Sequence, residues 1–196
     1  MTTLDHDFPS LAQGVVIAYG ISDVKHNHGC VCLGNSQDTS EFAIDAVLHW
    51  WQEQGCTHYP QATSILSLCE GGGSNSSRSY VFKAELERLA QESGLEVRVA
   101  HYPPYTSKYN PIEHRLFPHV TRVCQGVIFT SLALVKELMS KATTKAGLRV
   151  SVHILSKVYA TGRKVTNDVK EQIRLICDEN LPRWNYRVLS TNEPVI

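Results

Sequence analysis

Two glutamates, Glu70 and Glu113, stand where carboxylates could hold a divalent cation. Glu70 follows the apolar segment SILSLC, which predicts a short buried strand, and three glycines come after it. Glu113 comes 43 residues later, near the start of a predicted helix. Carboxylate oxygens are ligands that Mg²⁺ prefers, and two such ions can stabilise the attacking and leaving oxygens of a phosphodiester displacement. One interpretation of the pair is therefore a metal site for phosphoryl transfer, provided that the fold brings the two acids together.

The segment around Glu113, HYPPYTSKYNPIEHRLF, is suited to aiming one side chain. Its Pro-Pro pair favours a stiff extended loop, and Asn110 followed by Pro111 fixes the start of a helix. A second interpretation stays open, because Asn110 and Glu113 also have the spacing of a capping box. Glu70 could likewise be a turn acid, since a glycine triplet is also the default for a turn and is weak evidence of phosphate binding.

The elements that must position these acids alternate between strands and helices. A capping-box pattern at 38–41 starts one helix, Gly94 ends another, and Pro118 is expected to bend the helix that begins at Asn110. The patterns predict strands at 15–22, 29–34, 64–69, 95–101 and 148–154, helices at 38–55, 77–92, 130–145 and 166–178, and a last extended piece at 184–189.

This order predicts an α/β fold in which helices flank a mixed sheet. The ribonuclease H-like architecture contains the same order, but it begins with three antiparallel strands, whereas only two precede the first helix here. We therefore expect a ribonuclease H-like sheet that lacks its first, central strand. Such a loss would leave unpaired backbone groups at a gap, or force a compensating pairing, and would favour poor solubility.

Composition and charge set further limits. The chain has 196 residues, 42% of them apolar, and no apolar run long enough for a membrane span or a signal peptide, so we expect a cytoplasmic protein without a membrane partner. Residues 1–100 hold 5 Lys and Arg against 12 Asp and Glu, whereas residues 101–170 hold 11 against 3. The basic second half indicates a polyanion partner, although a surface imbalance without a partner explains it as well.

Six strings spread along the chain carry a family resemblance: AYGISDV, DTSEFAIDAVLHWW, LCEGGGSNSSR, HYPPYTSKYNPIEHRLF, TTKAGLRV and WNYRVLS. In this order they resemble insertion-sequence transposases of the ISAzo-thirteen type, members of the DDE superfamily. The resemblance implies DNA as partner, other transposase subunits as further partners, and two Mg²⁺ or Mn²⁺ ions. It implies that Glu113 is the third acid of the catalytic triad and that Glu70 occupies the position of the second acid. Both residues are then expected to be metal ligands.

Three basic residues near Glu113 are candidates for contacts with DNA phosphates: Lys108, Arg115 and Arg122. By the resemblance, residues 1–13 form a leader, 14–146 an incomplete DDE catalytic domain and 147–196 a C-terminal α/β extension. Each of the three cations could instead be ordinary surface charge.

Two departures from the family pattern lead us to expect a truncated transposase that is inactive alone. The family's leading aspartate precedes every segment found here. Glu70 replaces the second aspartate, and its extra methylene moves the carboxylate by about 1.5 Å, against a tolerance of about 0.5 Å. Two alternatives remain: a non-catalytic DNA-binding or transposase-interacting remnant, and the downstream half of an interrupted frame that another polypeptide completes.

Overall fold

The structure, a computed structural model, describes residues 14–190, which divide into two spatial units. We call residues 14–37 with 111–158 the hairpin unit, and residues 38–110 with 159–190 the pocket unit. Each unit is described by itself.

These spatial units are a different kind of division from the functional domains predicted from the sequence. The predicted boundaries after residues 13 and 146 stay predictions. The predicted leader, 1–13, lies outside the described residues.

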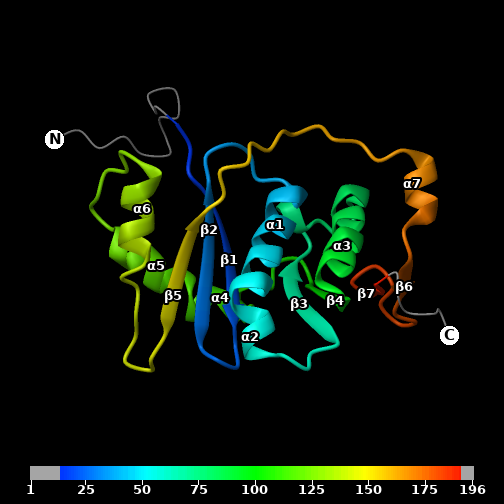
Figure 1. The fold of residues 1–196 in the computed structure, drawn as a ribbon, viewed down its shortest axis with the longest axis horizontal. Coiled ribbons are helices and arrows are strands. Elements are labelled where there is room, and N and C mark those ends of the chain that lie inside the picture. Colours follow the sequence, from blue (N-terminus) through cyan, green and yellow to red (C-terminus); the bar gives the residue numbers. More distant parts are fainter. Residues whose placement is uncertain (1–13, 191–196) are drawn as a thin grey trace. The chain divides into compact units, whose positions relative to one another are not determined.

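The hairpin unit contains a three-stranded mixed sheet in the order β1-β2-β5. β1 and β2 form the predicted antiparallel hairpin, and β5 runs parallel to β2. Three helices complete the unit, and an apolar core that includes Leu33, Val120 and Val135 joins them to the sheet. The elements of this unit (Figure 1) are β1 (Ile17–Asp23), β2 (His28–Gly34), α4 (Ile112–Arg115), α5 (Phe117–Cys124), α6 (Leu132–Met139) and β5 (Arg149–Ile154).

The pocket unit contains a four-stranded mixed sheet in the order β3-β4-β7-β6. β3 and β4 are parallel, whereas β7 is antiparallel to both β4 and β6. Helices α1 and α3 lie side by side against this sheet (Figure 1), and Phe82, Leu86 and Val97 are among the residues of their shared core. The elements are α1 (Ser40–Trp50), a π-helical turn (Trp51–Gly55), α2 (Cys56–His58), β3 (Ser64–Glu70), α3 (Tyr80–Ser93), β4 (Glu96–Tyr102), α7 (Asn167–Gln172), β6 (Leu175–Cys177) and β7 (Asn185–Val188).

Local signals account for where the two long helices begin and end. The Thr39 hydroxyl accepts a hydrogen bond from the Phe42 N–H at 3.2 Å and so caps α1. Ser79 caps α3 in the same way, and Gly94, at φ +72°, ends it in the left-handed conformation that glycine adopts without strain. The predicted cap near residue 38 and the predicted stop at Gly94 are thereby confirmed.

Two predicted helices are shorter in the structure, and a third is broken close to the proline at which a bend was expected. The helix predicted at 166–178 ends at Gln172, because Ile173 is extended and β6 pairs with β7. The helix predicted at 130–145 spans only α6. The helix predicted from Asn110 is broken at Leu116, one residue before α5, which has Pro118 in its first turn.

The expected mixed α/β fold is confirmed, but the single predicted sheet is two sheets. Within the described residues, β1 pairs only with β2 and β3 pairs only with β4, so each of these strands has one open edge. No helix in the described part of the chain combines the length and the apolar character of a membrane span.

Candidate active site

Glu70 is the last residue of β3, as the sequence predicted, and is exposed. Its neighbour Cys69 is buried in the core of the pocket unit, and burial raises the pKa of that thiol to about 12. Glu70 lies opposite Tyr102, the last residue of β4. The parallel ladder therefore places the carboxylate at the carboxyl ends of two adjacent strands, with its side chain in solvent.

The backbone of Glu70 is fixed by a buried histidine that sequence reasoning did not single out. His101 Nδ1 lies 3.3 Å from the Glu70 carbonyl oxygen, and His101 Nε2 lies 2.7 Å from the Tyr186 hydroxyl oxygen. Burial lowers the pKa of His101; the Glu70 carbonyl opposes this shift, and the Lys83 cation adds to it. A neutral His101 can then donate from Nδ1 to Glu70 and accept the Tyr186 hydroxyl proton at Nε2.

The alternation of inward and outward side chains along β4 is the signal that could have revealed His101. Val97, Val99 and His101 occupy every second position and are buried, so the strand predicts an inward histidine. A buried polar side chain in such a series must find hydrogen-bond partners. Its partner Tyr186 comes from a remote segment and could not be named from the local pattern.

The glycine loop after Glu70 is shaped by its own hydrogen bonds. Asn75 N–H donates to the Gly72 carbonyl and Ser76 N–H to the Gly73 carbonyl, each at 3.2 Å. Gly73 has φ +57°, which favours glycine. These two N–H groups are bonded within the turn, so they are not directed at a phosphate.

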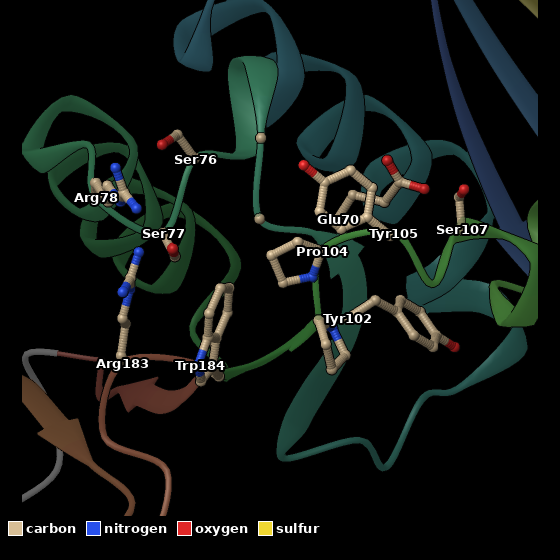
Figure 2. A pocket seen from close by; sticks show the side chains of 13 residues that line it. Glu70, Ser76, Ser77, Arg78, Tyr102, Pro104, Tyr105, Ser107, Arg183 and Trp184 are labelled. Atoms are coloured by element: carbon tan, nitrogen blue, oxygen red, sulfur yellow. The ribbon is translucent and has the colours of Figure 1, made fainter.

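A cavity of about 360 Å³ opens beside Glu70 within the pocket unit. Figure 2 shows Arg78, Arg183 and Trp184 on one side of it and Glu70, Tyr105 and Ser107 on the other. Such a volume is within the range of small-molecule sites, about 300–1,000 Å³. Glu70 is the one carboxylate among the residues that line it.

The Pro-Pro loop is not the extended segment that its prolines predict, because it forms a turn and a short 3-10 helix (Ser107–Tyr109) closed by short-range hydrogen bonds. The Thr106 hydroxyl donates to the Pro103 carbonyl at 2.6 Å, and Tyr109 N–H donates to the Thr106 carbonyl at 2.8 Å. The ammonium of Lys108 lies 4.9 Å from the centre of the Tyr109 ring. Lys108 is exposed, as a phosphate contact needs, but it is not among the residues that line the cavity.

Glu113 lies on α4, a single helical turn in the hairpin unit, and is half-buried. The N–H of Asn110, which the capping-box interpretation assigned to Glu113, donates to the Ser107 carbonyl at 2.8 Å. Because the Asn110 N–H is bonded within the turn 107–110, the structure does not support the capping-box interpretation, in which Glu113 accepts that N–H.

Two glycines in the hairpin set the position of α4. Leu116, at its end, is fully buried and lies so close to Gly29 that a Cβ there would collide with it. A Cβ on Gly20 would lie 2.6 Å from Phe117 Cε1. The missing side chains let the α4–α5 junction pack directly on the strands. Arg115 on α4 and Arg122 on α5 are exposed.

The predicted site residues are divided between the two units. Glu70 and Lys108 belong to the pocket unit, and Glu113, Arg115 and Arg122 belong to the hairpin unit. The sharing of one cation by Glu70 and Glu113 therefore stays a prediction, as does the contact of the three basic residues with DNA.

A comparison with protein families agrees with the sequence motifs. The family model described as the Rhodopirellula transposase DDE domain matches residues 1–190, which is nearly the whole chain. No curated protein and no solved structure matches the chain. Domains of the DDE transposase class act on DNA and generally use divalent metal ions. Since the match extends over both units, the chain belongs to the family of Rhodopirellula transposase DDE domains.

Proposed function

We propose that this chain is the ribonuclease H-like catalytic part of a DNA transposase, in which Glu70 and Glu113 together hold Mg²⁺ or Mn²⁺. The observation that carries the proposal is the environment of Glu70. An exposed carboxylate ends the edge strand β3, and it faces a cavity that is also lined by two arginines. The family match supports a function in transposition. We propose that the reaction is the cleavage and joining of DNA strands.

The residues present fit a divalent ion. Glu70 offers hard oxygen donors, and no hydrogen bond or ion pair engages its side chain within the described residues. The carboxylate of Glu113 likewise forms no hydrogen bond and no ion pair within the described residues. When bound, such an ion stabilises negative charge on phosphate oxygens and lowers the pKa of water. His101 has the supporting task of holding the strand end from which Glu70 projects.

The DNA backbone is proposed to lie along the exposed cations Lys108, Arg115 and Arg122. Phosphate contacts of this kind set the position of a duplex and carry no base sequence information. Each lost contact should therefore weaken binding to all sequences alike and reduce its salt dependence by about one unit of slope.

Glu70 itself is proposed to limit the activity. The resemblance places an aspartate at this position, and a constellation that must be held within about 0.5 Å does not absorb an added methylene. We expect little or no strand cleavage by the chain alone, and more from the Glu70→Asp variant.

The open edges of β1 and β3 favour a second arrangement. Each edge presents backbone N–H and C=O groups that a further strand could pair with. A strand from another polypeptide that also brings a third acid would complete both the sheet and the metal site. A synthetic strand peptide with an aspartate should then raise cleavage, and a peptide with asparagine instead should not.

Metal binding tests the main proposal without requiring activity. Mn²⁺ affinity of the full chain is measured by calorimetry for wild type, Glu70→Gln and Glu113→Gln. Glu137→Gln is the matched control, because Glu137 is an exposed acid on α6 that pairs with Lys141, just beyond the end of the helix. We expect a loss of at least about tenfold in both site variants, and an unchanged affinity in the control. Equal affinities in all four proteins would refute a shared cation.

A further inference from the structure

The cavity beside Glu70 has a cationic wall that a metal site does not require. Arg78 and Arg183 line it, both are exposed, and neither forms an ion pair within the described residues. Guanidinium groups match phosphate oxygens in geometry and charge. Four of the five other arginines in the described part of the pocket unit are ion-paired: Arg88, Arg98, Arg163 and Arg187. The two cations at the cavity are thus free for an anionic ligand.

An aromatic side chain adjoins this cationic wall. The Trp184 ring packs so closely on the glycine loop that a Cβ at Gly71 would lie 2.9 Å from its Cζ3 atom. The Arg183 guanidinium lies 4.9 Å from the centre of the ring. The backbone of Trp184 is held as well, because its carbonyl accepts the His101 N–H at 2.9 Å. Trp184 is therefore a fixed aromatic surface beside an exposed cation.

Tyr105 presents a second ring from the opposite side of the cavity (Figure 2). It is fully exposed, at 102%, and its φ is +64°, which is unfavourable for a residue with a Cβ. A ring that packs against nothing contributes little to the stability of the fold. Such backbone strain persists chiefly at binding and active sites.

We propose that this cavity binds one unpaired nucleotide of single-stranded DNA, with its phosphate at Arg78 and Arg183 and its base against Trp184 and Tyr105. The inference rests on the proposed function, which supplies DNA as the substrate. Bases inside a duplex are covered by their stacked neighbours, so only an unstacked base reaches aromatic walls of a concave site. Occupation of the cavity would bring the adjoining phosphodiester beside Glu70.

The test measures binding of a fluorescein-labelled oligothymidylate of about ten nucleotides by anisotropy. EDTA is present throughout, so the result does not depend on metal binding or cleavage. The site variants are Tyr105→Asn, which keeps a residue that tolerates positive φ, and Arg183→Gln. Arg174→Gln is the control, because Arg174 is an exposed arginine of the same unit that does not line the cavity.

We expect Tyr105→Asn to weaken binding about five- to hundredfold, the range found for loss of one stacked base. Arg183→Gln should also weaken it and lower the salt slope, whereas Arg174→Gln should bind as wild type does. A duplex of equal length should be insensitive to Tyr105→Asn. Because Tyr105 packs on nothing, its variant should unfold at the wild-type urea concentration.

Three results would overturn the proposal: binding unaffected by both site variants, equal effects of Arg183→Gln and Arg174→Gln, or dTMP binding as tightly as the oligonucleotide. The last would make a free nucleotide the occupant. Oligonucleotide binding that follows the pattern above, together with unchanged Mn²⁺ affinity in Glu70→Gln and Glu113→Gln, would keep the nucleotide site and reject the metal-dependent function.

Discussion

The two units hold their acids in place by different means. In the hairpin unit, Glu113 belongs to a single helical turn whose position depends on apolar contact, through Leu116 packed on Gly29. In the pocket unit, Glu70 ends a strand whose last carbonyl contacts His101, and the Tyr186 hydroxyl holds the other side of that ring. Apolar packing is insensitive to pH, whereas a buried histidine is not. The two halves of the proposed site should therefore fail under different perturbations.

Their interiors differ in the same sense. The hairpin unit has an apolar core, with Val31, Leu33 and Leu116 almost completely buried. The pocket unit adds charged side chains at the edge of its core, where Arg88 contacts three carboxylates, those of Asp45, Glu85 and Glu92. One unit is thus held mainly by packing, and the other by packing together with directional polar contacts.

The largest effect expected from this comparison is that of Leu116→Ala. Removing a fully buried leucine should lower the free energy of unfolding by about 2–5 kcal/mol, and it should also release α4 and weaken Mn²⁺ binding through Glu113. Urea unfolding and calorimetry measure the two effects. Leu181→Ala, at a 51% exposed leucine, should change stability by less than about 0.5 kcal/mol. Similar losses of stability and of Mn²⁺ affinity in both variants would contradict the inference that the packing of Leu116 positions α4.

Arg88→Met tests the polar contacts of the pocket unit. Arg88 Nη2 lies 2.6 Å from Asp45 Oδ1, and Arg88 Nε lies 2.7 Å from Glu85 Oε2. Glu85 is only 3% exposed but keeps an ion pair with Arg163. Losing Arg88 should therefore cost about 2–3 kcal/mol of unfolding free energy, less than the roughly 3–5 kcal/mol of a buried pair that loses its one partner. Urea unfolding measures this cost. Arg98→Met removes a more exposed pair with Glu96 and should cost at most about 1 kcal/mol. If the two costs are equal, burial of Glu85 is not what makes the network matter.

The stability cost of His101→Phe should depend on pH, and this dependence distinguishes the polar contacts that position Glu70 from the apolar packing that positions Glu113. It leaves the Glu70 carbonyl and the Tyr186 hydroxyl without their partner, at a cost of about 1–3 kcal/mol near neutral pH. Because the folded state lowers the pKa of His101, its contribution is present above the ordinary value of 6.5 and is lost as the pH falls below it.

The difference in unfolding free energy between wild type and His101→Phe should therefore shrink from about pH 7.5 to pH 5.5. Urea unfolding at several pH values measures it. Leu116→Ala is the comparison, since its cost should be nearly the same at both pH values. A constant difference for His101→Phe would mean that this histidine does not titrate as its burial requires.

The smallest effect expected is that of Gly71→Ala. The new Cβ would meet Trp184 at 2.9 Å and displace the ring, with a cost of about 1 kcal/mol and a change in tryptophan fluorescence. Gly72→Ala is the matched control, because a Cβ there meets nothing within 4 Å and its φ is −123°. A fluorescence change in both variants, or in neither, would contradict the inference that Trp184 packs closely on Gly71.

The positions of the strand ends and helix caps could be predicted because their causes are local. The apolar run before Glu70 predicts a strand that ends there, and the capping-box pattern near Thr39 and the glycine at 94 mark helix boundaries through contacts within four residues. The second half of the helix predicted across residues 166–178 is wrong for the opposite reason, since α7 ends at Gln172. Leu175–Cys177 pairs with β7, and this non-local ladder overrides the helical preference of the segment.

The sequence by itself determined the family motifs and the terminal position of Glu70 on its strand. The tertiary structure decided what surrounds Glu70. Tyr186 lies 85 residues beyond His101, and Trp184 reaches Gly71 from the same late segment. Patterns of polarity and spacing describe which face of a segment is buried, whereas the partners of that face are chosen only when remote segments pack together.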